Sequence, residues 1–184
     1  MSSTFSLVTP RLHLRPLTLE DAPALQRTMG DPIAMRAYER TFSIPDIQAW
    51  IERNLRRYAR FGVGLWAAEL LETGEVIGQC GLVPQELDGL SFLEIGYLFE
   101  RRHWHQGYAT EAARACRDYG FEQLSAPALY SIIKHDNLPS QNVARRVGMT
   151  PWKTVHYGDK LQDTQHILFR ITRDEMPRLC QEGH

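Results

Sequence analysis

The sequence predicts an α+β or mixed α/β fold rather than a helix bundle. Strand patterns dominate residues 65–99, and a strand–helix–strand–helix–strand run follows from residue 91 onward. The chain has 184 residues, of which 43% are hydrophobic and 23% are charged, so it is long and apolar enough to bury one core. We therefore expect residues 1–184 to form a single domain.

The first predicted elements are a strand and a helix. Leucines alternate with charged residues over 11–17, which is the pattern of a half-buried strand. Thr18 and Asp21 have the spacing of a capping box, which predicts a helix that ends near Gly30. Residues 31–45 show no period and are expected to be irregular.

A second helix is predicted to begin at Pro45, because proline is favoured in a first helical turn. Its apolar stripe at helical spacing consists of Ile47, Trp50, Ile51, Leu55 and Tyr58. Gly62 and Gly64 end this helix. Two strands over 65–71 and 75–83 then surround a short turn that ends in glycine, which indicates a hairpin.

The rest of the chain alternates strands with helices. Strands are predicted over 91–99, 129–134, 150–157 and 165–171, and helices over 107–124 and 138–147. Glycine marks the beginning of the first of these helices and follows the end of the second.

Composition and charge exclude several classes of protein. The 21 basic and 22 acidic residues leave a net charge of −1, so no basic excess indicates a nucleic-acid partner. The three cysteines form no CxxC pair and no disulfide framework, which indicates reduced thiols. No signal-peptide pattern opens the sequence and no run of about 18 apolar residues occurs. We therefore expect a cytoplasmic protein without a membrane segment.

One segment has the composition of an anion site at the start of a helix. The strand from Glu94 to Phe99 leads through a short loop to Gly107, where the helix begins. Amides in a first helical turn have no partner within the helix and carry partial positive charge, so they suit a phosphate or pyrophosphate. The small residues Gly107 and Ala109 leave room for it. Without a ligand, the same residues are simply a tight turn.

A second segment, Asn137-Leu-Pro-Ser140, lies at the next strand-to-helix junction. Asn is favoured as an N-cap, so Asn137 has a purely structural interpretation. In the functional interpretation, the Asn137 amide and the Ser140 hydroxyl face a ligand that lies between two diverging strands.

Together these segments resemble the GNAT superfamily of N-acetyltransferases, and within it the RimJ/RimL type, the ribosomal-protein-alanine acetyltransferases. The matching residues are Trp104-His-Gln-Gly107-Tyr-Ala-Thr-Glu-Ala112, Asn137-x-x-Ser140 and Val147-Gly148-Met149. The opening Thr9-Pro-Arg-Leu-His-Leu-Arg-Pro16 and the pair Asp31-Pro32 are also similar to that group. The resemblance covers nearly the whole chain.

The resemblance implies an acetyl-CoA-dependent N-acetyltransferase whose central, mostly antiparallel sheet is split like a V between strands 91–99 and 129–134. Pantetheine would lie in the split against the main chain of Tyr97, Leu98 and Phe99. Asn137 and Ser140 would contact the pantetheine arm from the other side. Pyrophosphate would bind the amides of His105, Gln106, Gly107, Tyr108, Ala109 and Thr110.

Three positions depart from the pattern of the family. Trp104 stands where a basic residue or glutamine is frequent, and His105 stands where glycine is frequent. Ala144 occupies the position of a tyrosine that protonates the leaving thiolate in many relatives. Ser140 is the best remaining donor to the thiolate. Two tyrosines are weaker alternatives, Tyr97 and Tyr130.

The expected reaction is direct attack of an amine on the thioester. The amide of Leu98 or Phe99 is the candidate that polarises the carbonyl. Glu94 is the candidate base, although an outward-facing ion-pair partner has the same pattern in an apolar strand. Four residues from Glu94 to Leu98 span about 13 Å, so Glu94 would act through water. Glu69 and Glu111 are weaker candidates.

The absence of an evident strong base bears on the acceptor. Deprotonating a lysine amine costs roughly 4.6 kcal/mol at pH 7, whereas an α-amine costs about 1 kcal/mol. We therefore expect a protein N-terminus or a small-molecule amine. Its groove is expected between residues 31–45 and loop 156–163, where Asp159 and Asp163 are candidate contacts of a cationic amine. Both a monomer and a homodimer are compatible with the sequence.

Two other functions stay open at this point. One is a non-catalytic acyl-CoA-binding sensor, which Ala144 favours, and the other is an interaction protein whose glycine loop is only a turn. His103 and His105 lack carboxylate or cysteine ligands at a suitable spacing, so no metal site is expected there.

Overall fold

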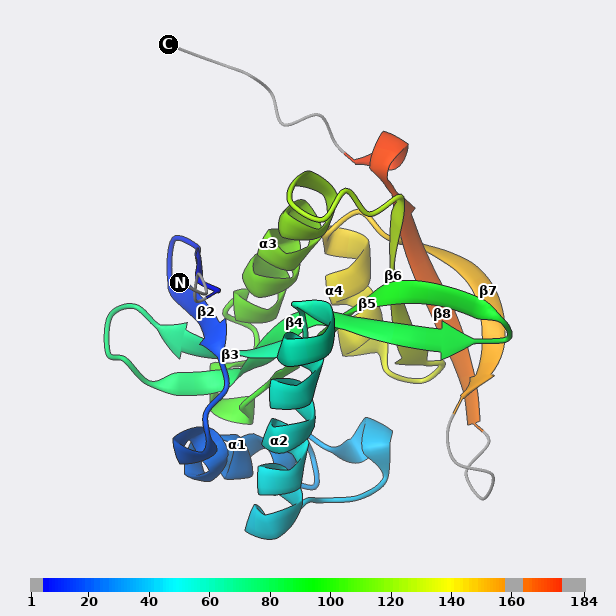
Figure 1. The fold of residues 1–184 in the computed structure, drawn as a ribbon. Coiled ribbons are helices and arrows are strands. Elements are labelled where there is room, and N and C mark those ends of the chain that lie inside the picture. Colours follow the sequence, from blue (N-terminus) through cyan, green and yellow to red (C-terminus); the bar gives the residue numbers. More distant parts are fainter. Residues whose placement is uncertain (1–4, 158–163, 177–184) are drawn as a thin grey trace.

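The computed structural model describes residues 5–157 and 164–176, which contain one sheet of eight strands (Figure 1). The strands are β1 (Leu7–Val8), β2 (Leu12–Pro16), β3 (Leu65–Leu70), β4 (Val76–Leu87), β5 (Leu90–Phe99), β6 (Ala128–Lys134), β7 (Thr150–Tyr157) and β8 (Thr164–Thr172). Their order in the sheet is β1-β2-β3-β4-β5-β6-β8-β7. Neighbours are antiparallel except β5 and β6, which are parallel. The predicted mixed fold with a mostly antiparallel sheet is confirmed.

Two pairs of helices cover opposite faces of this sheet. The helices are α1 (Ala22–Met29), α2 (Ile44–Phe61), α3 (Tyr108–Glu122) and α4 (Leu138–Arg146), with short 3-10 helices η1 (Leu19–Asp21), η2 (Arg36–Tyr38), η3 (Arg101–His103) and η4 (Arg173–Glu175). Successive side chains of β4 show the two faces, because they point to opposite sides of a strand. Gln79 accepts a hydrogen bond from Trp50 of α2 at 2.9 Å, and Cys80 lies against Cys116 of α3.

Local signals explain where the helices begin. The predicted capping box of Thr18 and Asp21 is present, but it opens η1, and α1 follows at Ala22. A second capping box, formed by Ser43 and Asp46, begins α2 one residue before Pro45. Sequence reasoning missed this box, although Ser and Asp three residues apart are its usual signal.

The predicted apolar stripe of α2 is wrong at one position. Leu55 is 39% exposed, whereas Asn54 is fully buried. The Asn54 side-chain oxygen accepts a hydrogen bond from the Leu65 amide at 3.0 Å, and its amide group donates to the carbonyl of Trp50 at 3.0 Å. Asn54 continues the inward face from Ile51 at helical spacing, so the polar residue takes the core position and both of its polar groups are satisfied.

The hairpin of β4 and β5 is longer than predicted. The predicted strand ended at Val83, but β4 continues through Pro84, which pairs with Leu93. Asp88 and Gly89 form the turn with φ values of 51° and 76°. Positive φ at both central positions is the geometry of a tight hairpin, and the Asp-Gly pair is its usual sequence signal. β5, the second strand of this hairpin, forms one side of the site described below.

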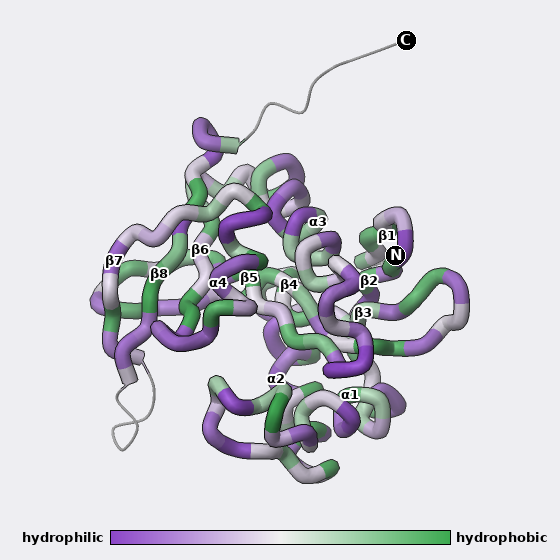
Figure 2. The backbone as a smooth tube through the Cα atoms, turned by 180° about the vertical axis from the view of Figure 1, so that it is seen from behind, coloured by the Kyte–Doolittle hydropathy of each residue, from purple (hydrophilic) through white to green (hydrophobic). Residues whose placement is uncertain are grey.

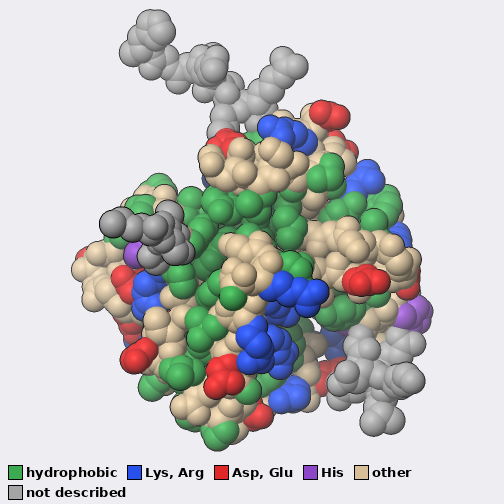
Figure 3. Space-filling view, in the orientation of Figure 1, with side chains coloured by type: hydrophobic (Ala, Val, Ile, Leu, Met, Phe, Trp, Pro, Cys, Tyr) green, Lys and Arg blue, Asp and Glu red, His purple; other side chains and the backbone are tan. Residues whose placement is uncertain are grey.

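Apolar side chains concentrate between the sheet and the helices. Hydrophobic stretches run along the central strands, as Figure 2 shows from behind. Trp66, Phe121 and Phe169 are among the largest fully buried side chains. Figure 3 shows acidic, basic and apolar side chains interspersed on the front face, with a small gathering of Lys and Arg near its middle. Within the described residues, none of the helices has the length and apolarity required to cross a membrane.

Candidate active site

The sheet opens between its two parallel strands. Glu94 of β5 and Tyr130 of β6 are the register pair that joins these strands. One residue further on, the Ser131 hydroxyl donates to the carbonyl of Ile95 at 2.8 Å. Beyond that point, no described register pair connects β5 to β6, although β5 continues to Phe99. The split expected between these two strands is therefore present.

The main chain of β5 alternates between its two neighbours. The carbonyl of Ile95 faces β6, where Ser131 binds it, whereas the amide of Glu100 donates to the carbonyl of Ile77 on β4 at 2.9 Å. Successive residues of a strand direct their amide and carbonyl groups to opposite edges. Odd-numbered residues at this end of β5 therefore face the split, and even-numbered residues face β4.

This alternation distinguishes the three residues predicted to hold a ligand through their main chain. Tyr97 and Phe99 direct these groups into the split. Leu98 directs them to β4, where its carbonyl lies 2.5 Å from the position that a Cβ on Gly78 would occupy. The indole of Trp104 donates to the carbonyl of Phe99 at 2.8 Å. The Phe99 amide, rather than that of Leu98, is thus placed to face a group in the split.

The loop after β5 ends in residues 105–110, which we call the glycine loop. Gly107 has a φ of 83° and is the N-cap of α3, and no side chain caps this helix end. The first hydrogen bond of the helical ladder runs from the Glu111 amide to the Gly107 carbonyl at 2.9 Å. The amides of Tyr108 to Thr110 precede it and have no partner within the described residues. This is the geometry of an anion site.

His105 stands in the same loop in a left-handed conformation, with a φ of 60°. This conformation costs a residue with a side chain roughly 1–2 kcal/mol. That cost gives a physical reason for the glycine that is frequent at this position in relatives. Within the described residues, the His105 ring makes no hydrogen bond and is exposed.

The stripe of small residues on α3 holds the glycine loop close to the sheet. Ala112, Ala113 and Cys116 are fully buried. A Cβ added to Gly120 would lie 2.9 Å from the Leu129 side chain. Because these positions carry only small side chains, this part of α3 packs closely against the strands, as the sequence indicated.

The first turn of α4 borders the other side of the split. The Asn137 side-chain oxygen accepts a hydrogen bond from the Ser140 amide at 3.3 Å, so Asn137 caps the helix as its structural interpretation required. The Tyr97 hydroxyl donates to the carbonyl of Ser140 at 2.7 Å and so ties β5 to α4. No hydrogen bond joins the Ser140 hydroxyl to another described residue. Ala144 is fully buried in the core.

The two alternative donors are engaged elsewhere. Burial is the main cause that raises the pKa of Tyr97, so its hydroxyl stays protonated, but its proton is directed to the Ser140 carbonyl. The Tyr130 ring packs against Phe92 and Trp152, with ring centroids 4.8 Å and 5.7 Å apart. Ser140 therefore keeps its place as the candidate donor.

Glu94 lies at the closed end of the split. Its carboxylate accepts hydrogen bonds from the Gln85 side chain at 2.6 Å and from the Ile132 amide at 3.3 Å. Burial raises the pKa of Glu94 above its usual range, while these two hydrogen bonds and the charge of Arg57 act in the opposite direction. The outward-facing ion pair considered from the sequence is absent, because among the described residues no cation forms a salt bridge with Glu94.

Tyrosines from two distant elements lie in the region of Glu94. Loss of water around its hydroxyl, together with the charges of Glu94 and of Tyr157 on β7, raises the pKa of Tyr38 in η2. Tyr38 keeps 47% of its surface exposed, so it lies at an open edge of this site. Tyr38 of the segment 31–45 and Tyr157 of β7 thus lie in the region of Glu94. The acceptor groove between residues 31–45 and loop 156–163 stays a prediction. Asp159 and Asp163 lie outside the described residues.

The weaker base candidates are committed to ion pairs. Glu69 contacts Arg15 at 2.8 Å. Glu111 contacts Arg11 at 2.6 Å and accepts two further hydrogen bonds from the N-terminal segment. Neither carboxylate faces the split in the way that Glu94 does, so Glu94 stays the leading candidate.

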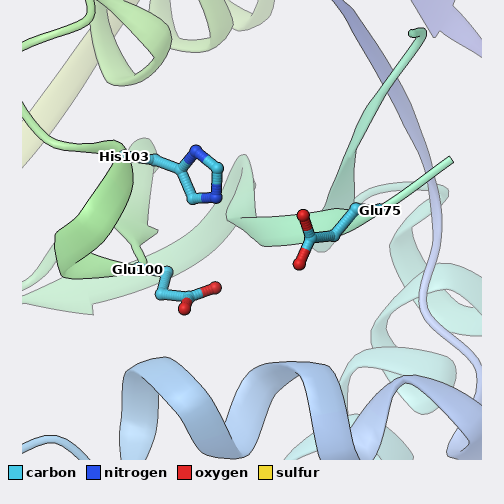
Figure 4. Close-up of side chains that lie close together, drawn as sticks. All are labelled: Glu75, Glu100 and His103. Carbon is cyan, nitrogen blue, oxygen red and sulfur yellow. The ribbon is translucent and has the colours of Figure 1, made fainter. Parts of the chain in front are cut away.

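A third group of titratable side chains lies where β4 begins and β5 ends (Figure 4). Glu75, Glu100 and His103 each place one ligand atom within 4.8 Å of the others. Arg27 contacts both carboxylates, at 3.1 Å and 3.0 Å, and Arg102 pairs with both as well. Two guanidinium groups balance two carboxylates here, so the contacts describe an ion-pair network at the base of the glycine loop. His103 lies beside this network, and its buried Nε2 has no hydrogen-bond partner among the described residues.

Sequence reasoning missed three residues that shape this site. Gln85 on β4 donates a hydrogen bond to Glu94, and Ser131 on β6 donates one to the main chain of β5. The charge of Arg57 on α2 acts on Glu94. Each lies on a different element, and no spacing in the sequence connects it to Glu94. Only the strand pairing brings these residues together.

The donors of the site fit coenzyme A. The unpaired amides at the start of α3 suit its pyrophosphate, and Gly107 leaves the approach to them open. The main-chain groups of Tyr97 and Phe99 provide a strand edge for the amides of the pantetheine arm. The strand edge of β5 is followed directly by the amides at the start of α3. In coenzyme A, the pantetheine arm is likewise followed directly by the pyrophosphate.

Comparisons with known proteins agree with this geometry. Residues 11–150 match the family model described as an acetyltransferase (GNAT) domain. The uncharacterized protein YkkB of Bacillus subtilis is 40% identical over 161 residues, which are 87% of this chain and 94% of YkkB. The structure of an acetyltransferase from Agrobacterium tumefaciens has a TM-score of 0.77 and 32% identity, covering 94% of this chain and 97% of that one.

The RimJ/RimL likeness extends to the fold. The structure of Mycobacterium smegmatis RimJ in complex with CoA-disulfide has a TM-score of 0.75 and 22% identity, and the match covers 95% of this chain and 89% of RimJ. At this identity the likeness concerns the fold alone. The family match, by contrast, spans most of the chain and includes both motifs. The chain therefore belongs to the GNAT acetyltransferase family, and it is an acyltransferase that uses acetyl-CoA.

Proposed function

We propose that this chain transfers the acetyl group of acetyl-CoA to a primary amine, either a protein N-terminal α-amine or the amine of a small molecule, by direct attack. Residues 1–184 would act as a single domain. The observation that carries the proposal is the split between β5 and β6, whose free strand edge leads directly into the unpaired amides of the glycine loop. Acetyl-CoA supplies the activated acetyl group in this reaction.

The glycine loop and the edge of β5 would bind and orient the co-substrate. The loop, residues His105 to Thr110, would hold the pyrophosphate, and the edge at Tyr97 and Phe99 would hold the pantetheine, with the Leu98 side chain beside it. The Phe99 amide would then stabilise the negative charge that develops on the acetyl oxygen. Asn137 and Ser140 would border the pantetheine from α4.

Ser140 would stabilise the thiolate that leaves. Its hydroxyl has no described hydrogen-bond partner, and the Tyr97 bond to its carbonyl fixes the helix turn that carries it. A serine is a weak acid, so we assign it a hydrogen bond to sulfur rather than complete proton transfer, which leaves water as the proton source. The buried Ala144 makes this arrangement necessary, because no acidic side chain occupies that position.

Glu94 would accept the proton of the amine through water. Its raised pKa makes the carboxylate a stronger base than an ordinary glutamate, and Gln85 keeps it in one orientation. β5 runs without interruption from Leu90 to Phe99, so Glu94 lies several residues along the strand from the Phe99 amide. A proton would therefore pass from the amine to Glu94 through water. Tyr38 and Arg57 would border the path of the acceptor.

A weakly basic amine suits this base best, and therefore we favour an α-amine as the acceptor. We also propose the cytoplasm as the compartment of the protein. Cys80 and Cys116 support it, because these buried thiols lie 3.6 Å apart without a disulfide, while Cys180 lies outside the described residues.

Calorimetric titration with acetyl-CoA, followed by an amine comparison, tests the proposal. We expect one-to-one binding and faster acetylation of a lysine-free peptide with a free N-terminus than of its N-blocked counterpart carrying one lysine. Preference for the lysine peptide would contradict the α-amine assignment. A folded protein that binds no acetyl-CoA would contradict the site itself.

The double variant Glu94→Gln, Ser140→Ala separates an enzyme from a sensor at the same site. We expect it to bind CoA normally and to lose turnover. If the wild-type protein binds acetyl-CoA but acetylates no amine of a broad panel, the sensor replaces the enzyme as the explanation of the site.

A further inference from the structure

The N-terminal segment contacts the beginning of α3 through one carboxylate. Glu111 accepts hydrogen bonds from the Thr9 hydroxyl at 2.7 Å, from the Arg11 amide at 2.8 Å and from Arg11 Nε at 2.6 Å. Burial alone would raise the pKa of Glu111, but these bonds together lower it, so the group is a carboxylate at neutral pH. Glu111 therefore fixes the direction of the Arg11 side chain.

Beyond Glu111, the Arg11 side chain contacts two residues of the glycine loop, Gln106 and Tyr108, and lies beside Gly107 between them. Arg11 Nη1 donates to the carbonyl of Gln106 at 2.9 Å. Its guanidinium carbon lies 4.3 Å from the centre of the Tyr108 ring. Arg11 Nη2 lies 3.4 Å from the position that a Cβ on Gly107 would occupy. No other side chain outside residues 100–111 makes as many described contacts with this loop.

These contacts determine which way the loop amides point. In a trans peptide the carbonyl oxygen and the following amide hydrogen point in opposite directions. Because Arg11 binds the carbonyl of Gln106, the amide of Gly107 points away from Arg11. The left-handed conformation of Gly107 then leads into the unpaired amides of Tyr108 to Thr110. Arg11 thus stabilises the one orientation in which the loop presents donors to an anion.

We propose that Arg11, held by Glu111, is a positioning residue that sets the glycine loop for the pyrophosphate of acetyl-CoA. The proposal rests on the assignment of this loop as the pyrophosphate site. Arginine suits the task because its planar fork binds the carboxylate and the carbonyl at once while its face stacks on Tyr108. A lysine has one compact ammonium and cannot make these contacts together.

A charge effect and a positioning effect predict opposite changes in the CoA affinity of the Glu111→Gln variant, so this variant distinguishes them. Glu111 is a negative charge next to a site for an anion, so simple electrostatics predicts that its removal tightens CoA binding. Positioning predicts weaker binding, because the glutamine loses the charge-assisted bonds that direct Arg11. We expect the Kd of CoA to rise about fivefold, which corresponds to about 1 kcal/mol.

Arg11→Met and Arg11→Lys complete the test. Direct calorimetry with CoA is expected to give about a tenfold higher Kd for the methionine variant and nearly the same loss for the lysine variant. Pantetheine, which lacks the pyrophosphate, is titrated by NMR into the millimolar range and should keep its affinity within about twofold. Arg56→Met is the control, because the Arg56 side chain is 70% exposed and its ion pair among the described residues is with Glu52, at 3.8 Å.

Each result supports or contradicts the proposal. Tighter CoA binding by Glu111→Gln, or recovery of wild-type affinity by Arg11→Lys, would show that only charge matters. Equal loss for CoA and pantetheine would show a general effect on the fold. If Arg11→Met does not fold, the other two variants decide. Failure of the wild-type protein to bind CoA contradicts the assignment of the site instead.

Discussion

The glycine loop and the surroundings of Glu94 border the same split, but they are built from different parts of the sequence. The loop is a continuous segment, residues 105–110, and among the described residues Arg11 is the one distant residue whose side chain binds it. Glu94 is contacted by Gln85 on β4 and by Ile132 on β6, and the charge of Arg57 on α2 acts on it as well. A main-chain site needs few partners, whereas a carboxylate among packed strands needs several groups to satisfy its oxygens and charge.

The difference predicts that changes in the two regions separate binding from turnover. Main-chain donors of the loop act on the co-substrate in its ground state, so damage there should raise the Kd of CoA. The carboxylate of Glu94 acts on the amine, so damage there should lower kcat and leave CoA binding intact. The following changes test this separation.

Gly107→Trp is expected to have the largest effect. The new side chain would begin 3.4 Å from Arg11 Nη2 and would disturb the contacts of Arg11 with the loop, and the left-handed φ of 83° is unfavourable for any side chain. We expect the Kd of CoA to rise at least about 100-fold, or about 2.7 kcal/mol, in a calorimetric titration. Gly74→Trp is the control, because Gly74 has a φ of 72° and open space around it. Similar losses in both variants would show that strain alone explains the result.

Glu94→Gln should reduce kcat about 100-fold, the lower range for loss of a general base, and leave the Kd of CoA unchanged. Steady-state kinetics and calorimetry on the same preparation measure both values. Glu86→Gln on the same hairpin is the control, since Glu86 is exposed and has no described ion pair. A variant that keeps its kcat would remove Glu94 from the mechanism.

Glu111→Gln should also reduce stability, because it weakens the contacts between the N-terminal segment and α3. We expect the free energy of unfolding at pH 7 to fall by about 2 kcal/mol. The folded pKa of Glu111 lies below its ordinary value of 4.5, so its contribution is present above that pH and is lost as the pH falls through the folded value. Urea unfolding should therefore show the variant and the wild type converging in acid. Glu52→Gln, at an exposed pair, should change little.

Gln85→Leu is expected to have the smallest effect, and it concerns pH. The hydrogen bond from Gln85 lowers the pKa of Glu94, so its removal raises that pKa further. The base must be unprotonated, so the acidic limb of the kcat profile should move to higher pH. Glu94→Gln should lack this limb. A shift to lower pH would contradict the role of Gln85.

The sequence allowed prediction of the features that depend on neighbouring residues. The glycine loop, the Asn137 cap and the small-residue stripe of α3 all lie within short segments, and the structure has each of them. The capping box at Ser43 and the Asp88-Gly89 turn were also readable from local signals, although both were missed.

Features that depend on strand pairing were not predictable in the same way. The contact of Gln85 with Glu94 requires the register of a hairpin whose length was underestimated at Pro84. The burial of Asn54 requires the Leu65 amide, which comes from the next strand. Which of two adjacent amides, at Leu98 or Phe99, faces the split depends on the pairing of β5 with β4. Each of these three features depends on how a different segment of the chain pairs in the sheet.

The split also means that the apoprotein carries two strand edges inside its own sheet. Exposed edges pair readily with other chains and promote aggregation. Here three side chains protect them: Ser131 binds Ile95, Glu94 binds Ile132, and Trp104 binds Phe99. These bonds therefore limit edge-to-edge association of the protein without its co-substrate. Coenzyme A would occupy the remaining strand edge, and its binding to the folded state should raise the melting temperature by mass action.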